Sequence, residues 1–206
     1  MITKEILAEK ILRRINGGDF ALSSQIKKQD VYLCMEEAYG FVVQQYLNIA
    51  GADNAGGFVS VYPAVPVLKD TVRDKFYSVL PAQLVSLNNG AGIRQISGTK
   101  DETDVFVPMN SGDEGMFSGL EAGNLTGKKA YWLELDRVYY KNLESYWEDS
   151  TVMIKMIASI YSLSEDSFIP IPAGVETMFQ DEIMKRLMPQ KLMPQHKQAD
   201  NQDINA

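Results

Sequence analysis

Apolar residues near both ends of the chain recur at the spacing of an α-helix. From Thr3, which can cap a helix, they return every three or four residues as far as Ile15. A second helix begins near Ser24 or Asp30 and carries a stripe at this spacing, and a third stripe follows Pro172, a residue suited to the first turn of a helix. The pattern therefore predicts three amphipathic helices, whose apolar faces are Ile6, Leu7, Ile11, Leu12 and Ile15; Val31, Met35, Ala38, Val42 and Tyr46; and Val175, Met178, Phe179, Ile183 and Leu187.

A fourth helix is predicted to begin at Ser150, which can act as its cap. Its apolar face consists of Met153, Ile157, Ile160 and Tyr161. Glycines 17 and 18 end the first helix, and the prolines at 170 and 172 keep the residues before them out of the α region. We therefore expect two helix pairs, one at each end of the chain, that together form a helical bundle.

Between residues 58 and 143 the apolar residues come instead in short runs bounded by Gly, Pro, Asn and Asp. Runs of this length with this punctuation are typical of β-strands. Pro63, Pro66 and Pro81 have no amide proton to donate, so the first strands should be edge strands or broken ones. The middle of the chain is predicted to be a β-rich, antiparallel insertion with strands at 58–67, 76–80, 83–87, 93–96, 105–107 and 130–140.

The end of the chain carries a short direct repeat, because Leu187-Met188-Pro189-Gln190 returns as Leu192-Met193-Pro194-Gln195. The polar residues after it cannot bury enough apolar surface to fold alone. This segment is either a frayed terminus or a tail that docks on a partner. In the second interpretation its anchors are Leu187, Met188, Leu192, Met193 and Pro194.

These patterns predict an α+β fold in four parts. Residues 1–57 form the N-terminal helix pair of the bundle, and residues 58–143 form the β-rich insertion. Residues 144–188 supply the C-terminal helices that complete the bundle, and residues 189–206 form an extended polar tail. With 206 residues, one domain with an insertion is expected rather than two independent domains.

Composition narrows the function classes. The formal net charge of −7 argues against a surface that follows nucleic-acid phosphates. Cys34 is the one cysteine, so an internal disulfide is excluded, and its apolar helical surroundings indicate a buried structural thiol. No stretch approaches the roughly 18 apolar residues of a membrane span. We expect a soluble protein made in a reducing cytoplasm, with no membrane partner.

Candidate catalytic chemistry is sparse. The one histidine, His196, lies in the polar tail, so a zinc site or a cysteine–histidine pair cannot be built in the predicted core. Carboxylates cluster at Asp101, Glu102 and Asp104, at Asp113 and Glu114, and as the pairs Glu134/Asp136 and Glu144/Asp149. None has the spacing of a calcium loop, and such pairs are too common to indicate a glycosidase. We expect no catalytic, cofactor-binding or metal-binding residue. A small metal-dependent hydrolase using residues 101–114 stays open as an alternative.

Aromatic residues gather between the last predicted strand and the helix after it, at Tyr139, Tyr140, Tyr146 and Trp147. A place in the core explains most of them. Exposed members of the cluster would suit a subunit interface, where aromatic residues are enriched.

Several segments together resemble a known family. They are residues 1–19 (MITKEILAEKILRRINGGD), 30–33 (DVYL) with the helix that follows, 80–93 (LPAQLVSLNNGAGI), 167–175 (SFIPIPAGV) and the repeated LMPQ. With the order helix pair, β-rich insertion, helix pair and tail, the chain resembles head-to-tail adaptor or ring proteins of short-tailed bacteriophages, in particular those of crAss-like phages. Asn88 departs from the family's hairpin, which has proline at this position.

The resemblance implies a virion protein of the neck, made in the host bacterial cytoplasm, without catalysis. It implies a homo-oligomeric ring, a dodecamer, stacked beneath the portal protein. The tail would reach the portal or an adjacent ring, and the β-rich part would contact other tail or neck proteins. DNA would pass through the lumen without specific contacts, which an acidic wall favours. An assembly or binding module absent from the finished particle is the remaining alternative.

Overall fold

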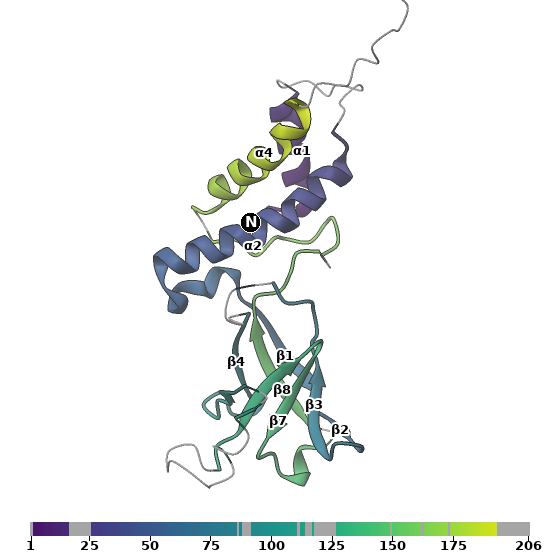
Figure 1. Ribbon diagram of the computed structural model, residues 1–206, viewed down its shortest axis with the longest axis vertical. Coiled ribbons are helices and arrows are strands. Elements are labelled where there is room, and N and C mark those ends of the chain that lie inside the picture. The colour runs from purple at the N-terminus through teal and green to yellow at the C-terminus, as the bar shows by residue number, and fades with distance from the viewer. Residues whose placement is uncertain are drawn as a thin grey trace, which may run out of the picture. The chain divides into compact units, whose positions relative to one another are not determined.

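A computed structural model describes residues 2–16, 26–85, 87, 92–110, 112–113, 117, 127–148, 150–161, 163–172 and 174–192, without the side chains of 52–54 and 188–192. The chain divides into two compact units (Figure 1). The helical unit comprises residues 1–57 and 163–206, and the β unit comprises residues 58–162. Both ends of the chain thus belong to the helical unit, and the β unit is inserted between them.

The described helices of the helical unit are α1 (Lys4–Ile15), α2 (Lys28–Ala50) and α4 (Glu176–Leu192). A 3-10 helix, η1 (Ala52–Phe58), follows α2. Thr3 caps α1 as predicted, because its hydroxyl accepts a hydrogen bond from the Ile6 amide at 3.2 Å. Arg13 and Arg14 lie in the last turn of α1, where positive charge complements the helix dipole.

The predicted apolar faces of α2 and α4 form the core of the helical unit. The Tyr39 ring of α2 lies edge-on to the Phe179 ring of α4, with centroids 6.0 Å apart. The Tyr39 hydroxyl also donates a hydrogen bond to the Pro170 carbonyl at 3.1 Å. The helix predictions for these three segments are confirmed, and their fully buried members include Leu7, Ile11, Val31, Met35, Ala38, Val42, Phe179, Ile183 and Leu187.

Residues 163–170 run along the start of α1. The amides of Lys4 and Glu5 donate to the carbonyls of Ser167 and Glu165 at 3.1 and 2.9 Å. These bonds satisfy amides that a helix N-terminus leaves without an internal partner. The Lys28 ammonium adds ion pairs to Glu5 at 2.7 Å and to Glu165 at 3.0 Å. The two chain segments of the helical unit, residues 1–57 and 163–206, are therefore joined by backbone and side-chain bonds.

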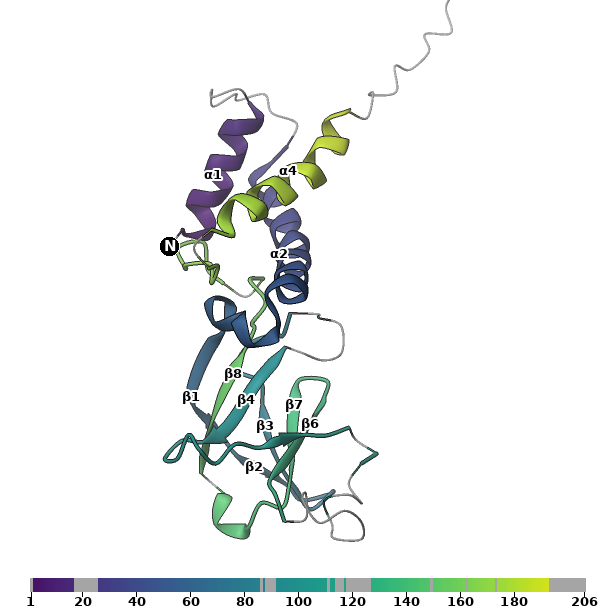
Figure 2. The same cartoon turned by 90° about the vertical axis from the view of Figure 1, so that its left-hand side faces the viewer.

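The β unit contains two sheets (Figure 2). The three-stranded sheet has the order β1 (Ser60–Pro66), β8 (Thr151–Met156), β4 (Ile93–Gly98). The five-stranded sheet has the order β2 (Leu68–Asp70), β3 (Lys75–Val79), β7 (Arg137–Lys141), β6 (Ala130–Glu134), β5 (Val107–Pro108). Neighbouring strands are antiparallel except β5 and β6, which are parallel. A short 3-10 helix, η3 (Ser145–Trp147), follows β7.

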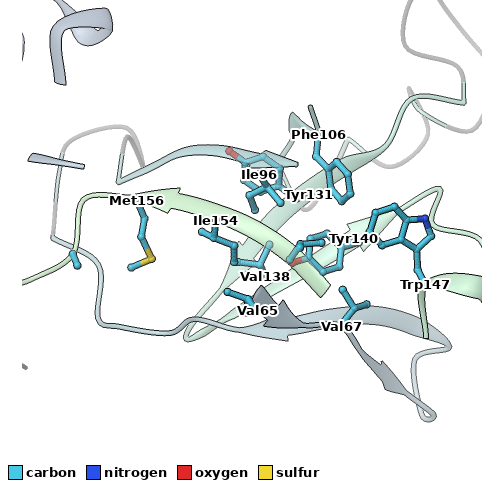
Figure 3. Close-up of a cluster of buried hydrophobic side chains, with 12 residues drawn as sticks. Val65, Val67, Ile96, Phe106, Tyr131, Val138, Tyr140, Trp147, Ile154 and Met156 are labelled. Atoms are coloured by element: carbon cyan, nitrogen blue, oxygen red, sulfur yellow. The ribbon is translucent and has the colours of Figure 1, made fainter. Parts of the chain in front are cut away.

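One apolar core lies between the two sheets (Figure 3). The Phe106 ring lies edge-on to Tyr140 and to Trp147, with both pairs of centroids 5.7 Å apart. Both sheets and the loops between them supply the core, whose members are Val65, Val67, Ile96, Phe106, Tyr131, Val138, Tyr140, Trp147, Val152, Ile154, Met156 and Ala158.

The predicted helical bundle is wrong. The described chain has three α-helices and two sheets, an α+β fold with most of its elements in strands. Residues 151–156, predicted to be helical, form β8, the central strand of its sheet. Val152, Met153 and Ile154 are consecutive and all buried, so β8 is covered on both faces. A strand buried on both faces lacks polar alternation and cannot be told from a buried helix by periodicity.

Three details of the predicted insertion also change. The single strand expected at 130–140 is a hairpin, β6 and β7, joined by Leu135 and Asp136. Leu135 has a φ of 55°, and neither loop residue is a glycine or an asparagine that would have marked the turn. The described residues of the run 83–87 contribute only an isolated bridge, and the β5–β6 pair is parallel. The prediction for the proline-rich first strand is confirmed: β1 is an edge strand with a register shift between Tyr62 and Val65.

Candidate assembly surfaces

One row of residues along α2 is exposed at every fourth position. Rows with this spacing are the ridges through which helices pack against one another. Three of the exposed side chains are large and apolar: Leu33 is 62% exposed, Phe41 is 41% exposed and Ile49 is 84% exposed. We call this row the α2 ridge; it consists of Gln29, Leu33, Glu37, Phe41, Gln45 and Ile49. Single exposed apolar residues are common, so it is their alignment in one row that makes the α2 ridge a candidate contact surface.

Arg186 of α4 holds the middle of the α2 ridge in place. Its guanidinium pairs with Glu37 at 3.1 Å and with Glu182 at 3.2 Å. It also lies 5.7 Å from the centroid of the Phe41 ring, within cation–π range. Partly exposed ion pairs contribute about 0–1 kcal/mol each. Their main effect here is to order Glu37 and Phe41.

A groove of about 490 Å³ lies beside the α2 ridge. Phe41, Val42 and Gln45 of α2 form one wall. The other wall comes from the residues before and within α4, namely Gly174, Thr177, Met178, Asp181, Glu182 and Lys185. The helical unit therefore presents a ridge and a groove side by side, the two shapes that helix packing joins.

A second surface covers one face of the five-stranded sheet. Tyr77, Tyr139 and Trp132 sit opposite one another on β3, β7 and β6. Successive ring centroids are 5.8 and 5.5 Å apart. Side chains alternate between the faces of a strand, so these rings point away from the core that holds Tyr131, Val138 and Tyr140.

Three cations cover these rings. Arg137 lies 4.9 Å from the centroid of Tyr77, Arg73 lies 5.1 Å from Tyr139, and Lys75 lies 4.8 Å from Trp132. Because of this cover, Trp132 is only 3% exposed and Tyr139 only 4% exposed. We call the six residues the cation–aromatic face. The charged groups, and not the rings, are what a ligand at this face would meet.

Two acidic residues next to the cation–aromatic face, Glu134 and Asp70, hold Arg73 and Trp132 in position. Glu134 accepts hydrogen bonds from Arg73 at 2.6 Å and from the Trp132 indole at 3.0 Å. The bond from Arg73 lowers the pKa of Glu134. Asp70 accepts from the backbone amides at 72 and 73, and these bonds lower its pKa and shape the turn that carries Arg73. Arg137 differs, because it forms no ion pair within the described residues. The hydrogen bond with the Tyr139 hydroxyl is the largest contribution that raises its pKa, and the charge of Asp136 adds to it.

Of the five predicted tail anchors, Leu187 alone has a described side chain. It is fully buried in the helical unit, which assigns it to this chain's own core. The expected start of an extended tail at residue 189 is wrong, because α4 continues to Leu192. The side chains of Met188 and Leu192, and the whole of Met193 and Pro194, lie outside the described residues. Docking by these four stays a prediction.

The carboxylates around residues 101–113 point to separate partners. Thr103 donates to Asp101 and lowers its pKa, and the Asn110 amide donates to Asp113 at 2.9 Å. Glu102 pairs with Lys155 and Asp104 with Lys129. Across the described ranges no three His, Cys, Asp or Glu side chains form a group able to hold a metal ion. Glu114, Asp149 and His196 lie outside those ranges.

The remaining residues discussed in the sequence analysis lie in the core, in a loop or at the surface. Cys34 is buried on α2, and burial raises the pKa of its thiol, as the sequence indicated. Asp136 lies in the hairpin loop and not on the strand of Glu134. Of the aromatic cluster, Tyr140 and Trp147 belong to the core, whereas Tyr146 is exposed.

Comparison with known proteins gives no assignment. No protein-family model matches the chain, and no curated protein matches it. None of the helices in the described part is long and apolar enough to cross a membrane.

The sequence did not predict either candidate surface. Leu33 and Ile49 fall outside the apolar face of α2, and that offset is the signal that could have marked the α2 ridge. On β3 and β7, Lys75, Tyr77, Arg137 and Tyr139 alternate cation and aromatic at a period of two, which places all four on one face. Arg73 comes from a turn, so only the folded chain shows that it belongs to this face.

Proposed function

We propose that this chain is a structural subunit of a short-tailed bacteriophage particle. In this role it forms a ring or adaptor that connects the portal protein to the tail and surrounds the DNA exit channel, without catalysis. The observation that carries the proposal is the α2 ridge beside its groove. The resemblance to phage ring proteins supports it independently.

In the proposed ring, the α2 ridge of one copy packs into the groove of the next. The groove shares Phe41 and Gln45 with the ridge, but its other wall comes from α4, so we propose a head-to-tail contact of the ridge with that wall. Head-to-tail contacts form a ring when the rotation between neighbours closes. A dodecamer is the ring size that the resemblance implies. Fully burying an exposed Leu, Ile or Phe side chain contributes roughly 1.5–3 kcal/mol. One contact of this size is weak, so the subunits assemble firmly only when the ring closes on the portal.

The proposed passage of DNA is consistent with the charge of the chain. Proteins grip duplex DNA by neutralising phosphates and releasing counterions. A subunit with a net charge of −7 offers little for that exchange, so DNA can move through a ring of such subunits. Met188, Leu192, Met193 and Pro194 are proposed to reach the portal or an adjacent ring.

The experiment uses the phage that encodes the chain. Purified particles are analysed by quantitative mass spectrometry, for the wild type and for the double variant Leu33→Ser, Ile49→Ser. Val72→Ser is the matched control, since Val72 is an exposed apolar residue of a β-unit turn.

We expect the wild type and the control in the particles at many copies each, and at least a tenfold loss of the double variant. Circular dichroism of the purified variants verifies that the helices persist. Absence of the wild-type chain from the particles overturns the proposal. Normal incorporation of the double variant overturns the role of the α2 ridge.

A further inference from the structure

The β unit carries an acidic projection after β7. Residues 144–148 include Glu144 and Glu148, both exposed, and Tyr146, which is 64% exposed. Neither carboxylate forms an ion pair within the described residues. We call residues 144–148 the acidic turn.

The acidic turn is held rigidly by its one buried residue. Trp147 packs in the core against Phe106, and the Lys129 ammonium lies 4.9 Å from its ring centroid. The Trp147 amide donates to the Glu144 carbonyl at 3.0 Å, and the Ser150 hydroxyl donates to the Trp147 carbonyl at 2.6 Å. The exposed side chains therefore start from a fixed backbone, which lowers the entropy lost on binding.

The cation–aromatic face has the complementary pattern. The Arg137 guanidinium is exposed and forms no ion pair in the described part of the chain, and Lys75 lies on the same face. Leu68 and Val79, opposite Tyr77 and Arg137, add exposed apolar surface. The cation–aromatic face thus combines cations with apolar neighbours. The acidic turn combines carboxylates with a tyrosine between them.

We propose that the cation–aromatic face of one copy binds the acidic turn of a second copy of this chain. Glu148 pairs with Arg137 with Glu144 beside it, and Tyr146 packs on the apolar flank. The inference rests on the proposed function, to which it adds a contact between β units. Like the contact at the α2 ridge, it joins two different surfaces, so it is compatible with a closed ring.

Nucleic acid is the competing occupant, and two observations disfavour it. Single-stranded nucleic acid binds by stacking bases on exposed rings, whereas Trp132 and Tyr139 are covered by the protein's own cations. Duplex DNA carries one charge per about 1.7 Å and is repelled by a chain of net charge −7. Local carboxylate–cation contacts are less affected, because salt screens the remaining charges beyond about 8 Å.

Charge reversal gives a direct test with the full-length chain. Arg137→Glu and Glu148→Arg are each purified, and self-association is measured by sedimentation velocity at protein concentrations up to about 1 mM, where even a contact of about −4 kcal/mol is half formed. Lys100→Glu is the control, because it reverses an exposed charge of the β unit outside both surfaces.

We expect each variant to associate at least tenfold more weakly than the wild type and the control. An equimolar mixture of the two variants should associate like the wild type, because each face then meets a turn of opposite charge. Rescue in the mixture requires a contact between these two surfaces and would not follow from a loss of folding.

Several results overturn the inference. The inference is overturned if the wild type stays monomeric at about 1 mM. It is also overturned if the single variants associate as strongly as the wild type. Binding of a labelled single-stranded oligonucleotide that is lost in Arg137→Glu assigns the face to nucleic acid instead. In each case the proposed function stands if the chain is present in purified particles, and fails if it is absent from them.

Discussion

Replacing Phe179 with alanine tests how the helical unit is held together. Phe179 is fully buried, and its ring lies edge-on to Tyr39 at 6.0 Å. Tyr39 cannot readily move into the space left by the ring, because its hydroxyl is bonded to the Pro170 carbonyl at 3.1 Å. A Phe→Ala change in a core costs about 3–5 kcal/mol when the site cannot collapse. The lost edge-on aromatic contact accounts for about 0.5–1.5 kcal/mol of that cost.

The chain offers separate spectroscopic probes for its two units. The long α-helices α1, α2 and α4 lie in the helical unit, whereas both tryptophans, Trp132 and Trp147, lie in the β unit. Helical circular dichroism therefore reports the first unit, and tryptophan fluorescence reports the second. With a urea m value of about 2 kcal/mol/M, Phe179→Ala should lower the circular-dichroism midpoint by about 1.5–2.5 M. The fluorescence midpoint should stay in place.

Phe168→Ala is the matched control, since Phe168 is an exposed phenylalanine of the same unit. Its effect on the circular-dichroism midpoint should correspond to less than about 1 kcal/mol. The reasoning is refuted if Phe179→Ala changes that midpoint no more than the control does. A fluorescence midpoint that falls as far as the circular-dichroism midpoint would show that the two units unfold together.

Two further predictions concern the helical unit. Gly57→Ala should lower the free energy of unfolding by about 1–3 kcal/mol. Its new Cβ would lie 2.5 Å from the Pro172 Cγ and 3.0 Å from the Pro172 Cα. Gly56→Ala is the control and should have little effect in the same urea titration, because no atom lies within 4 Å of its new Cβ. The hydrogen bond from Lys28 lowers the pKa of Glu165 below its ordinary 4.5, so this bond stabilises the fold above pH 4.5 and is lost as the pH falls through the lowered pKa. Glu165→Gln should therefore be less stable than the wild type near neutral pH, and the difference should shrink below pH 4.5; a difference independent of pH would contradict this assignment.

The sequence predicted the helices whose apolar stripe is buried on one side only. In α1 and α4 the buried residues return every three or four positions, so helical periodicity identifies them. In β8 both faces are covered, and Thr151 to Met156 is an almost continuous apolar run that fits either a strand or a helix. The β6–β7 hairpin was missed for a different reason: Leu135 adopts a positive φ that sequence patterns assign to glycine or asparagine.

The two candidate surfaces depend on exposure and on contacts between distant residues, which a sequence pattern does not contain. Phe41 lies next to the apolar stripe of α2, and only packing against α4 shows that it stays exposed. Arg186 reaches Glu37 from a helix 149 positions away in the chain. Likewise, Arg73 reaches Glu134 across 61 positions. Sequence reasoning could identify the residue types that suit an interface but could not place them on one surface.

The proposed ring would be visible in an electron cryomicroscopy reconstruction of the phage particle that is proposed to contain this chain. We predict a ring of copies of this chain between portal and tail, with the α2 ridge of each copy seated against α4 of its neighbour. A map in which this chain is absent, or in which Leu33 and Ile49 face solvent in every copy, would contradict it.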